Sequence, residues 1–475
     1  MSFNFPLGQT IYPVCPILDG ADFISGYAFK SNDFIDSGHP VIKIKNIQSG
    51  KVTIADSQYV STETVRKLDK FKLSDRDVLI AMTGQGSVGR VGRLSCEDGT
   101  TPYLNQRVGK FVADEEKLNI DYLYYVLSTK QYQEILFLAG SGSGQPNLSP
   151  ATIKSVEIPF APYEVQCRIS SILNAIDEKI SLNEKTNQTL EQMAQALFKS
   201  WFVDFEPVKV KIAVLEAGGS QEDATLAAMT AISGKDADAL AVFEREHPEQ
   251  YAELKTTAEL FPSTMQESEL GEIPEGWSIK PLDGIATYQN GLALQKFRPE
   301  NENDFLPVVK IAQLKKGFSD GEEKASPNIK PECIIDNGDV VFSWSGSLMV
   351  DIWCGGKAAL NQHLFKVSST KYPKWLYYKY TAHHLIEFQR IAEAKAVTMG
   401  HIKREHLSQA KCLMPSSETV HAFTPFFEPV LNKVISNRLE TRKLENIRDT
   451  LLPKLLSGEI TLPEAEQAVS EVENV

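Results

Sequence analysis

The chain has 475 residues, of which 42% are hydrophobic and 23% are charged, and its formal net charge is −13 at pH 7. This composition is typical of a globular protein with two or three cores, and it argues against disorder and collagen-like repeats. Because the chain has no run of roughly 18 apolar residues and no secretion signal, we expect a cytoplasmic protein without a membrane span. The six cysteines have no CxxC spacing, which favours reduced thiols over a metal site.

Two acidic segments carry the negative charge. Residues 216–275 contain 14 acidic and 3 basic side chains, and residues 459–475 contain 5 acidic and no basic side chains. The rest of the chain therefore has a net charge of +3, which is compatible with the basic surfaces that nucleic-acid binding requires.

Residues 1–161 are predicted to form a mixed α/β domain. The apolar run at residues 40–47 is strand-like, and so are residues 77–83. The next segment, residues 84–89, matches the dinucleotide fingerprint GxGxxG. It is followed by glycine-broken, strand-like sequence where the fingerprint requires a helix, so a tight hairpin turn explains it better than a nucleotide site.

Residues 162–206 are predicted to form a long helix. An apolar seam with a seven-residue spacing is typical of helices that pack along their length. An unbroken helix from Tyr163 to Lys199, which is 37 residues, is about 55 Å long at about 1.5 Å per residue. This length is comparable with one or more turns of B-DNA. Such a helix is suited to separate two domains. The seam residues are Ile169, Ile176, Asn183, Leu190 and Leu197.

An acidic, helical insertion is expected at residues 207–271, and a second mixed α/β domain at residues 272–415. The second domain is expected because it repeats the first in the same order, which predicts two lobes of one topology. Residues 307–314 resemble residues 40–47, residues 336–342 resemble residues 74–80, Asn361 and Gln362 repeat Asn105 and Gln106, and residues 375–378 repeat residues 122–125.

The second domain is followed by its own long helix, predicted at residues 416–458. In its seven-residue seam, Asn437 takes the place that Asn183 has in the first helix. A lone Asn in an apolar seam fixes register at a cost in stability, so the shared position predicts that the two helices pair with each other. The alternative is two unrelated amphipathic helices, each packed on its own domain. The other seam residues are Phe423, Val430, Leu444 and Leu451.

These patterns predict the fold class. We expect an α+β protein in which two similar mixed α/β domains are joined by two long, antiparallel, coiled-coil-like helices with pseudo-twofold symmetry. The acidic tail, residues 459–475, is predicted to be poorly ordered.

Polar side chains beside the predicted strands are candidates for contact with DNA. Asn and Gln pair bidentately with adenine and Arg with guanine in the major groove, whereas lysines suit phosphates. Most polar loop side chains are only solvated, so we expect about a third of the candidates to touch bases. The candidates in the first domain are Lys43, Lys45, Asn46, Gln85, Ser87, Arg90, Asn105, Gln106, Arg107 and Gln145. Those in the second domain are Lys310, Gln313, Lys315, Lys316, Trp344, Ser345, Asn361, Gln362 and His363.

No catalytic pattern occurs in the chain. It contains no GxxxxGK[ST] loop, no HExxH, no GxSxG and no DPPY-like or NPPF-like tetrapeptide. His383 and His384 lie in a tyrosine-rich helical segment, where packing is a more common role than metal ligation. We therefore expect neither catalysis nor a metal in this chain.

Three segments resemble the specificity subunits of Type I restriction-modification systems. Residues 195–207 look like the end of that family's central helix, residues 271–277 like the start of its second target-recognition domain, and residues 451–458 like the end of its distal helix. The resemblance covers nearly the whole chain. It implies that each domain reads one half of a split DNA sequence and that the helices set the unread spacer.

The resemblance also implies partners that carry out the chemistry. Two methyltransferase subunits would dock along the helices and methylate adenine with S-adenosylmethionine, and a translocating nuclease that uses ATP and Mg²⁺ could join them. This chain would hold no cofactor and would bind double-stranded DNA but no membrane. A fused restriction or methylation enzyme and a protein-binding coiled-coil scaffold stay open as alternatives. The residues expected to set the register and dock the partners are Ile176, Asn183, Leu190, Leu197, Val430, Asn437, Leu444 and Leu451.

Overall fold

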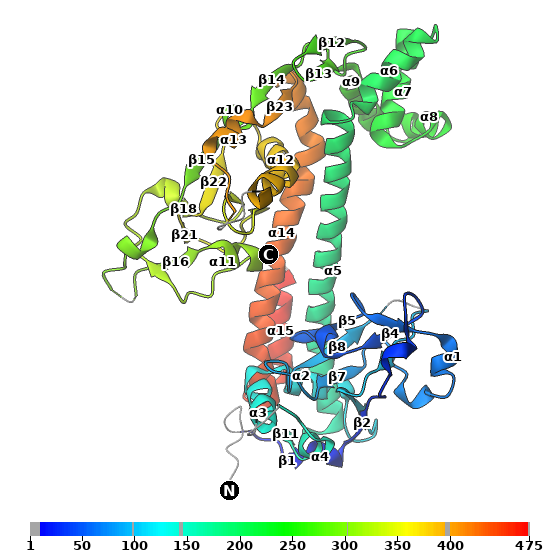
Figure 1. Ribbon diagram of the computed structural model, residues 1–475, viewed down its shortest axis with the longest axis vertical. Helices are drawn as coiled ribbons and strands as arrows, with labels where there is room; N and C mark the ends of the chain where they lie inside the picture. The colour runs from blue at the N-terminus through cyan, green and yellow to red at the C-terminus, as the bar shows by residue number, and fades with distance from the viewer. Residues whose placement is uncertain (1–9, 97–98, 142–145, 302, 395–399, 474–475) are drawn as a thin grey trace. The chain divides into compact units, whose positions relative to one another are not determined.

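The computed structural model describes residues 10–96, 99–141, 146–301, 303–394 and 400–473. The chain divides into two compact units (Figure 1). Unit 1 contains Met1–Ser181 and Thr441–Val475, and unit 2 contains Leu182–Glu440. Each unit holds one α/β domain together with a part of each of two long helices.

The α/β domain of unit 1 is built on small sheets covered by short helices. Its strands are β1 (Val14–Pro16), β2 (Ala21–Ser25), β3 (Phe34–Ile35), β4 (His39–Ile42), β5 (Gly50–Thr53), β6 (Gln58–Val60), β7 (Val78–Ala81), β8 (Val91–Ser95), β9 (Tyr103–Leu104), β10 (Val108–Ala113) and β11 (Glu157–Pro159). Its helices are α1 (Thr62–Val65), α2 (Ile120–Ser128), α3 (Lys130–Gly140) and α4 (Pro150–Lys154). One sheet has the order β2-β10-β7-β8-β5 and another β3-β6-β4-β9. All four residues of β7 are buried, and its apolar core includes the tyrosines of α2.

The α/β domain of unit 2 has corresponding parts. Its strands are β14 (Ser278–Pro281), β15 (Thr287–Asn290), β16 (Leu306–Val309), β17 (Lys324–Ala325), β18 (Ile334–Ile335), β19 (Val340–Ser343), β20 (Met349–Ile352), β21 (Ala358–Leu360), β22 (Leu364–Ser368) and β23 (Lys411–Met414). Its helices are α10 (Leu282–Ile285), α11 (Ile311–Lys316), α12 (Lys374–Ala394) and α13 (Arg404–Gln409). Two sheets have the orders β15-β22-β19-β20 and β17-β16-β21-β18.

The two domains share one topology, which confirms the duplication predicted from the sequence. The strand order β2-β10-β7-β8 of unit 1 matches β15-β22-β19-β20 of unit 2. A parallel pair recurs as β4 with β9 and as β16 with β21, and an antiparallel pair recurs as β1 with β11 and as β14 with β23. Equivalent loops of the two domains therefore leave equivalent strands.

The two long helices are α5 (Tyr163–Phe202) and α14 (Ser417–Ser457). They run antiparallel, because within unit 2 residues later in α5 contact residues earlier in α14. The Asn183 side chain donates to Glu440 Oε2 at 2.9 Å, and the Asn187 side chain donates to the Val434 carbonyl at 3.3 Å. The prediction that these helices pair is confirmed, and the alternative of two unrelated helices is wrong.

The two equivalent asparagines, Asn183 and Asn437, do not bond to each other. Asn437 Nδ2 donates to Asn187 Oδ1 at 2.9 Å, and Asn183 bonds to Glu440 instead. In antiparallel helices, equivalent positions meet only at the midpoint, so two equivalent asparagines away from it find other partners. Asn187, which is 8% exposed, is the seam residue that the sequence analysis missed.

The predicted seam is buried to different degrees along its length. Four of the eight register residues, Ile176, Leu197, Leu444 and Leu451, belong to apolar clusters or pack against them, and Val430 lines a small cavity. Those that are buried are Ile176, Asn183, Asn437, Leu444 and Leu451, and those that are half-buried are Leu190, Leu197 and Val430. The half-buried positions lie where the α/β domain of unit 2 and the helices meet, so their packing is shared between both.

The acidic segment between the domains folds into four helices, α6 (Glu206–Glu216), α7 (Gln221–Ser233), α8 (Ala237–Glu246) and α9 (Pro248–Glu259), followed by the hairpin β12 (Met265–Ser268) and β13 (Gly271–Pro274). These helices have a small apolar core of their own, which includes Met229 and Leu240. Lys211 is 2% exposed, and its ammonium donates to the carbonyls of Ala258 and Phe261. Those bonds compensate the burial that lowers the pKa of this amine.

The acidic tail differs from the prediction of poor order. Residues Leu462–Glu473 form helix α15, in which Ala465 is fully buried. Arg168 of α5 bonds Glu466 at 2.7 Å, and Val469 packs beside Ile176 and Leu444. Apolar residues at a helical spacing outweigh the acidic composition, because one face of the segment covers the helix pair of unit 1. Among the described residues, no helix is long and apolar enough to cross a bilayer.

Candidate DNA interface

Two polar turns meet at one end of the unit 1 domain. One joins β7 to β8 at residues 82–90, and the other joins β9 to β10 at residues 105–107. The Met82 amide donates to the Arg107 carbonyl at 3.0 Å, which holds the turns side by side. Arg90 Nη1 donates to the Ile47 carbonyl at 3.1 Å and thereby ties the short 3-10 helix η3 (Ile44–Asn46) to the same end.

The equivalent turns meet in the same way in unit 2. Trp344, after β19, donates from its indole to the Gln362 carbonyl at 3.3 Å, and Gln362 lies between β21 and β22. The Ile402 amide donates to the Trp344 carbonyl at 3.0 Å, so a third segment joins this end. The structure thus brings together, in each domain, the polar residues that the sequence analysis selected from separate segments.

The exposed amides and Arg107 lie in these turns, whereas exposed Lys45 lies in η3 and exposed Lys315 and Lys316 lie at the end of α11. Together they combine hydrogen-bonding amides with cations, which is the chemistry of contacts to bases and phosphates. The exposed candidates are Lys45, Gln85, Gln106 and Arg107 in the first domain and Lys315, Lys316 and Gln362 in the second. Ser87, Gln313, Trp344 and His363 are half-buried. Gln145 lies outside the described residues.

Four candidates are buried within the domains. Asn46 is 1% exposed, and its amide nitrogen donates to the carbonyls of Thr53 and Ala55, both at 3.1 Å. Asn105 is 9% exposed, and Asn361 and Ser345 are each 4% exposed. The Asn46 amide nitrogen is thus already paired inside the protein, and burial makes all four side chains less accessible to a base edge than the exposed candidates are.

Five cationic candidates already have partners within the protein. Lys45, although exposed, donates to the Asp56 carbonyl, and exposed Lys316 lies 3.7 Å from Asp320. Lys43 donates to Gln58 and lies 3.8 Å from the centre of the Phe34 ring, and burial, together with Lys45, lowers the pKa of its amine. Lys310 pairs with Glu323, and Arg90 donates to two backbone carbonyls. The sequence could not distinguish these lysines from free ones, because their partners come from other segments of the chain.

An aromatic and imidazole cluster distinguishes the second domain. The Trp344 ring centre lies 5.7 Å from that of His363 and 6.4 Å from that of His401. Ser345 Oγ and His363 Nδ1 are 3.0 Å apart, which fixes the imidazole ring. A half-exposed indole held in this way offers a flat apolar face beside the Gln362 amide.

A glycine in each domain was missed by the sequence analysis. A Cβ atom on Gly26 would lie 2.2 Å from the Asn105 carbonyl oxygen, and one on Gly291 would lie 2.2 Å from that of Leu360. Only glycine allows this close approach, so both positions set the shape of the β9–β10 and β21–β22 turns. Exposed Lys30 and Lys296 follow these glycines closely. The signal was present in the repeat, since each glycine begins a Gly-x-Ala sequence.

The glycine-rich sequence at residues 84–89 is a turn between antiparallel strands β7 and β8, as the sequence analysis favoured. Gly84, Gly86 and Gly89 all have positive φ angles, of 109°, 73° and 81°. No helix begins there, so the geometry that holds a dinucleotide is missing. Within the described ranges, no group of three or more His, Cys, Asp or Glu residues is arranged to hold a metal ion.

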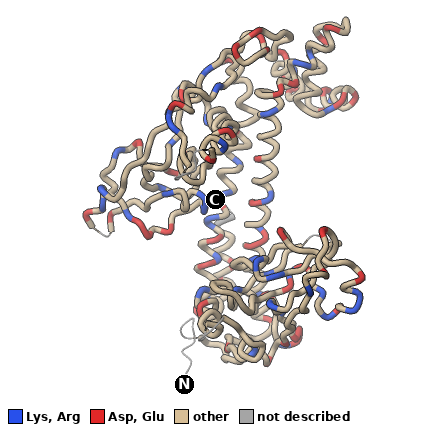
Figure 2. The backbone as a smooth tube through the Cα atoms, in the orientation of Figure 1, with Lys and Arg blue, Asp and Glu red and all other residues tan. Residues whose placement is uncertain are grey.

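Charge is distributed along the chain as Figure 2 shows, with Lys and Arg in the loops of both α/β domains and on the long helices. In unit 1, exposed Arg66, Lys67, Lys70 and Lys72 follow α1 in quick succession, and Lys72 bridges to Tyr103 of β9. A cationic segment therefore lies beside the strand that leads to the Gln106 turn. Such a position suits contacts to the phosphates that flank a base-reading turn.

Comparisons with known proteins agree with this arrangement. Residues 14–192 and 274–447 match the family model described as Type I restriction modification DNA specificity domain. The chain is 30% identical over 368 residues to the Type I restriction enzyme HindI specificity subunit of Haemophilus influenzae, a match that covers 74% of this chain and 80% of that protein. It is 27% identical over 353 residues to the Type I restriction enzyme MjaIX specificity subunit of Methanocaldococcus jannaschii, with 72% and 70% covered.

A solved structure shares the fold. The crystal structure of the Type I restriction-modification system S subunit from M. genitalium aligns with a TM-score of 0.52, at 14% identity, over 94% of this chain and 96% of that chain. The two matched segments of the family model each contain one α/β domain and continue into the long helix that follows it.

Proposed function

The chain belongs to the family of Type I restriction-modification DNA specificity proteins, and we propose that each of its α/β domains reads one half of a bipartite DNA target. The observation that carries this proposal is the repetition of two polar turns at the same end of the same topology, once in each domain. The chain is thus a recognition subunit and not an enzyme.

We propose that some exposed side chains contact base edges and that others contact phosphates. Gln106, Arg107 and Gln362 are suited to base edges in the major groove, because amides and guanidinium groups form bidentate pairs there. The exposed lysines beside them are suited to phosphates, which position the protein without reading sequence. The proposed phosphate contacts are Lys30, Lys45, Lys296, Lys315 and Lys316.

Binding selections on variants test this division. Arg107→Ala should relax discrimination at one base pair of one half-site by about 1–3 kcal/mol, and Gln362→Ala should do so in the other half-site. Lys315→Ala should weaken all sequences alike and reduce the salt slope by about one. Lys433→Ala, at an exposed position on α14, is the matched control and should change neither measurement. Loss of discrimination in both half-sites from one turn variant would contradict the assignment.

The bipartite nature of the site is tested by footprinting. The full chain, together with its methyltransferase partner, should protect two short blocks of DNA separated by an unprotected spacer, and affinity should fall steeply with salt. Protection of one contiguous block would refute two-part reading. Affinity that is insensitive to salt would instead favour a protein-binding scaffold.

We also propose that the catalytic partners dock on the long helices. Leu182 and Met193 of α5 are 58% and 59% exposed, although both are large and apolar. They are eleven residues apart, about three helical turns, and therefore share one face of α5. Exposed apolar residues aligned on one helix face are typical of an interface.

Co-purification tests the docking face. Leu182→Asp with Met193→Asp should release the methyltransferase subunits and leave the chain folded, because neither side chain contributes to a buried core. Gln192→Asp, on a different exposed face of the same helix, is the matched control. Retention of the methyltransferase by the double variant would place the docking face elsewhere.

The composition of the complex completes the proposal. Two methyltransferase subunits would bind S-adenosylmethionine and methylate adenine. A translocating nuclease would carry out restriction that depends on ATP and Mg²⁺. This chain would act in the cytoplasm, where its six cysteines stay reduced. The lengths of α5 and α14 would set the spacer, so inserting about four residues, roughly one turn, into both helices should lengthen the preferred spacer.

A further inference from the structure

In each unit, a charged cluster bonds the α/β domain to both long helices. In unit 1, Arg93 of β8 bonds Asp121 at 2.9 Å and Asp177 of α5 at 3.4 Å. Asp177 also accepts from the Tyr125 hydroxyl at 2.8 Å and from Arg448 of α14 at 2.9 Å. We name this group the first clasp, and its members are Arg93, Asp121, Tyr125, Asn174, Asp177 and Arg448. It joins a strand, the tyrosine-rich helix and both long helices.

The second clasp, in unit 2, consists of Glu191, Asp351 and Arg438. Arg438 of α14 bonds Asp351 of β20 at 2.7 Å and Glu191 of α5 at 2.9 Å, and it also donates to the Ile352 carbonyl at 3.0 Å. Strands β8 and β20 are equivalent in the two domains, because each is the second strand of the β7–β8 or β19–β20 hairpin. Both clasps therefore reach the helices from the same strand of the fold.

The ion pair between the domain strand and the helix that follows it has opposite polarity in the two clasps. In the first, the domain presents a cation, Arg93, to a carboxylate on the helix that follows it, Asp177. In the second, the domain presents a carboxylate, Asp351, to a cation on the helix that follows it, Arg438. Both clasps are partly shielded from water, since Arg93 is 13% and Arg438 27% exposed. Partial burial makes a mismatched charge costly there.

The repeat identifies the residues of the long helices in unit 2 that are equivalent to the helix residues of the first clasp. Counted from the equivalent asparagines Asn183 and Asn437, Asp177 corresponds to Leu431 and Arg448 corresponds to Ala194. An independent contact supports this alignment. Ser170 bonds the N-cap residue of α2, and its equivalent Thr424 bonds Trp375 of the equivalent helix α12. The helix partners of the first clasp are thus replaced by apolar residues in unit 2.

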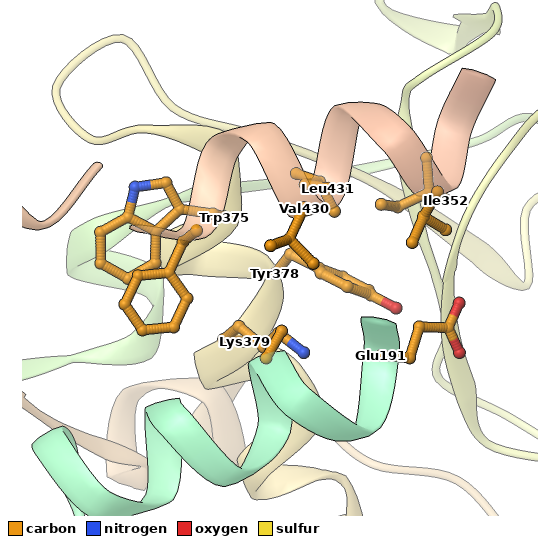
Figure 3. A pocket seen from close by; sticks show the side chains of 10 residues that line it. Glu191, Ile352, Trp375, Tyr378, Lys379, Val430 and Leu431 are labelled. Carbon is orange, nitrogen blue, oxygen red and sulfur yellow. The ribbon is translucent and has the colours of Figure 1, made fainter. Parts of the chain in front are cut away.

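A cavity marks the place where the first clasp has no counterpart. It has a volume of about 20 Å³ and is lined by Ala194, Leu431 and Tyr378, the equivalents of Arg448, Asp177 and Tyr125, among other residues. Figure 3 shows the Tyr378 hydroxyl pointing toward Glu191 across this space. Lys379, which is 7% exposed, lines the same cavity. Ala194 is much smaller than Arg448, and Leu431 offers no charge in the place of Asp177, so the arginine and the aspartate that bond in unit 1 have no counterpart here.

The reverse exchange would place like charges together. By the same count, Arg438 corresponds to Glu184 and Glu191 corresponds to Glu445. The second domain, placed before α5, would present Asp351 to two glutamates. The first domain, placed before α14, would present Arg93 to Leu431. Neither domain would find its partners on the other's helix positions.

We propose that the two clasps, with their ion pairs of opposite polarity, assign each recognition domain to its own position on the helices, so that the order of the two half-sites is set by helix residues as well as by covalent order. The proposal rests on the proposed function only where it concerns half-sites. The docking itself is a property of the protein alone. Asp177, Asp351 and Arg438 are positioning residues in this account, and none of them is assigned a contact with DNA.

A full-length chain in which residues 14–161 and 278–415 are exchanged tests the assignment. Hydrogen exchange of the tyrosine-rich helices α2 and α12 reports domain docking. With native helices, the exchanged chain should show amide exchange about tenfold faster than the native chain, which corresponds to about 1.4 kcal/mol. Glu184→Arg should rebuild the second clasp on α5, since Glu445 already stands in the place of Glu191. Leu431→Asp with Ala194→Arg should rebuild the first clasp on α14 and α5.

Restored protection in the rebuilt chain supports the proposal, and equal protection with native helices overturns it. Because the exchanged chain could fail to fold, the native chain provides a second test. Arg438→Glu should speed exchange in α12 by about tenfold. Adding Asp351→Lys and Glu191→Lys inverts the whole clasp and should restore protection. Lys433→Glu, which makes the same charge change at an exposed position of α14, is the control.

If the chain with the inverted clasp shows amide exchange in α12 as fast as that of Arg438→Glu alone, the proposal is overturned. This readout needs no DNA, so its outcome is separate from that of the proposed function. A chain with intact clasps that protects no bipartite site would refute two-part reading, and the domain assignment would stand.

Discussion

The buried pair Asn187 and Asn437 offers a quantitative test of the helix pairing. Asn437 is 1% exposed and Asn187 is 8% exposed, and the only bond between them joins Asn437 Nδ2 to Asn187 Oδ1. Within the described structure, Asn437 Oδ1 has no hydrogen-bond partner. Asn187→Leu would leave the whole Asn437 amide unpaired, so we expect a loss of about 1–3 kcal/mol. Asn437→Leu removes the unpaired oxygen as well as the donor, so its cost should be smaller.

The double variant Asn187→Leu with Asn437→Leu should be at least as stable as the native chain. It leaves no orphaned amide, and two buried leucines each gain about 1.5–3 kcal/mol of apolar burial. A double-mutant cycle should therefore give a coupling energy of about 0.5–3 kcal/mol. The gain has a cost in specificity, because an apolar seam tolerates sliding of one helix along the other.

Urea unfolding of the four chains measures the cycle, and hydrogen exchange of α14 reports the register. Asn432→Leu, the same substitution at an exposed position of α14, is the matched control and should change stability by less than about 0.5 kcal/mol. Additive effects of the two single substitutions would refute the reasoning. So would a double variant that is less stable than Asn187→Leu alone.

Three further predictions follow from single sites. Burial, with a smaller contribution from His383, lowers the pKa of His384 to about 4, so stability should fall by roughly 3 kcal/mol as pH drops from about 6.5 to 4, and His384→Phe should flatten that dependence in urea unfolding. Gly26→Ala forces a Cβ to 2.2 Å from the Asn105 carbonyl and should lower both Tm and affinity for one half-site. Trp344→Ala should weaken only the other half-site in footprinting; a uniform loss would contradict a local role.

The sequence predicted the pairing of the long helices more fully than the accessibility of residues in the polar turns. The seven-residue seam showed the helix pairing, because both helices carry the pattern over five repeats. It did not show that Asn187 is the partner of Asn437, since partners across antiparallel helices depend on where the midpoint lies. In the same way, Asn46 looked like a base-reading amide until the fold surrounded it with three backbone and side-chain acceptors.

By itself, the sequence determined that the protein is duplicated, that each copy ends in a long helix and that the helices pack on each other. These properties are local or periodic, so the spacing of apolar residues and the order of repeated segments reveal them. Only the tertiary structure decided which polar side chains remain available, as it paired Lys310 with Glu323 and left Gln106 exposed. It also decided that equivalent strands present Arg93 in one domain and Asp351 in the other to the helix that follows. Both outcomes depend on contacts between residues far apart in the chain, and such contacts leave no regular pattern in a single sequence.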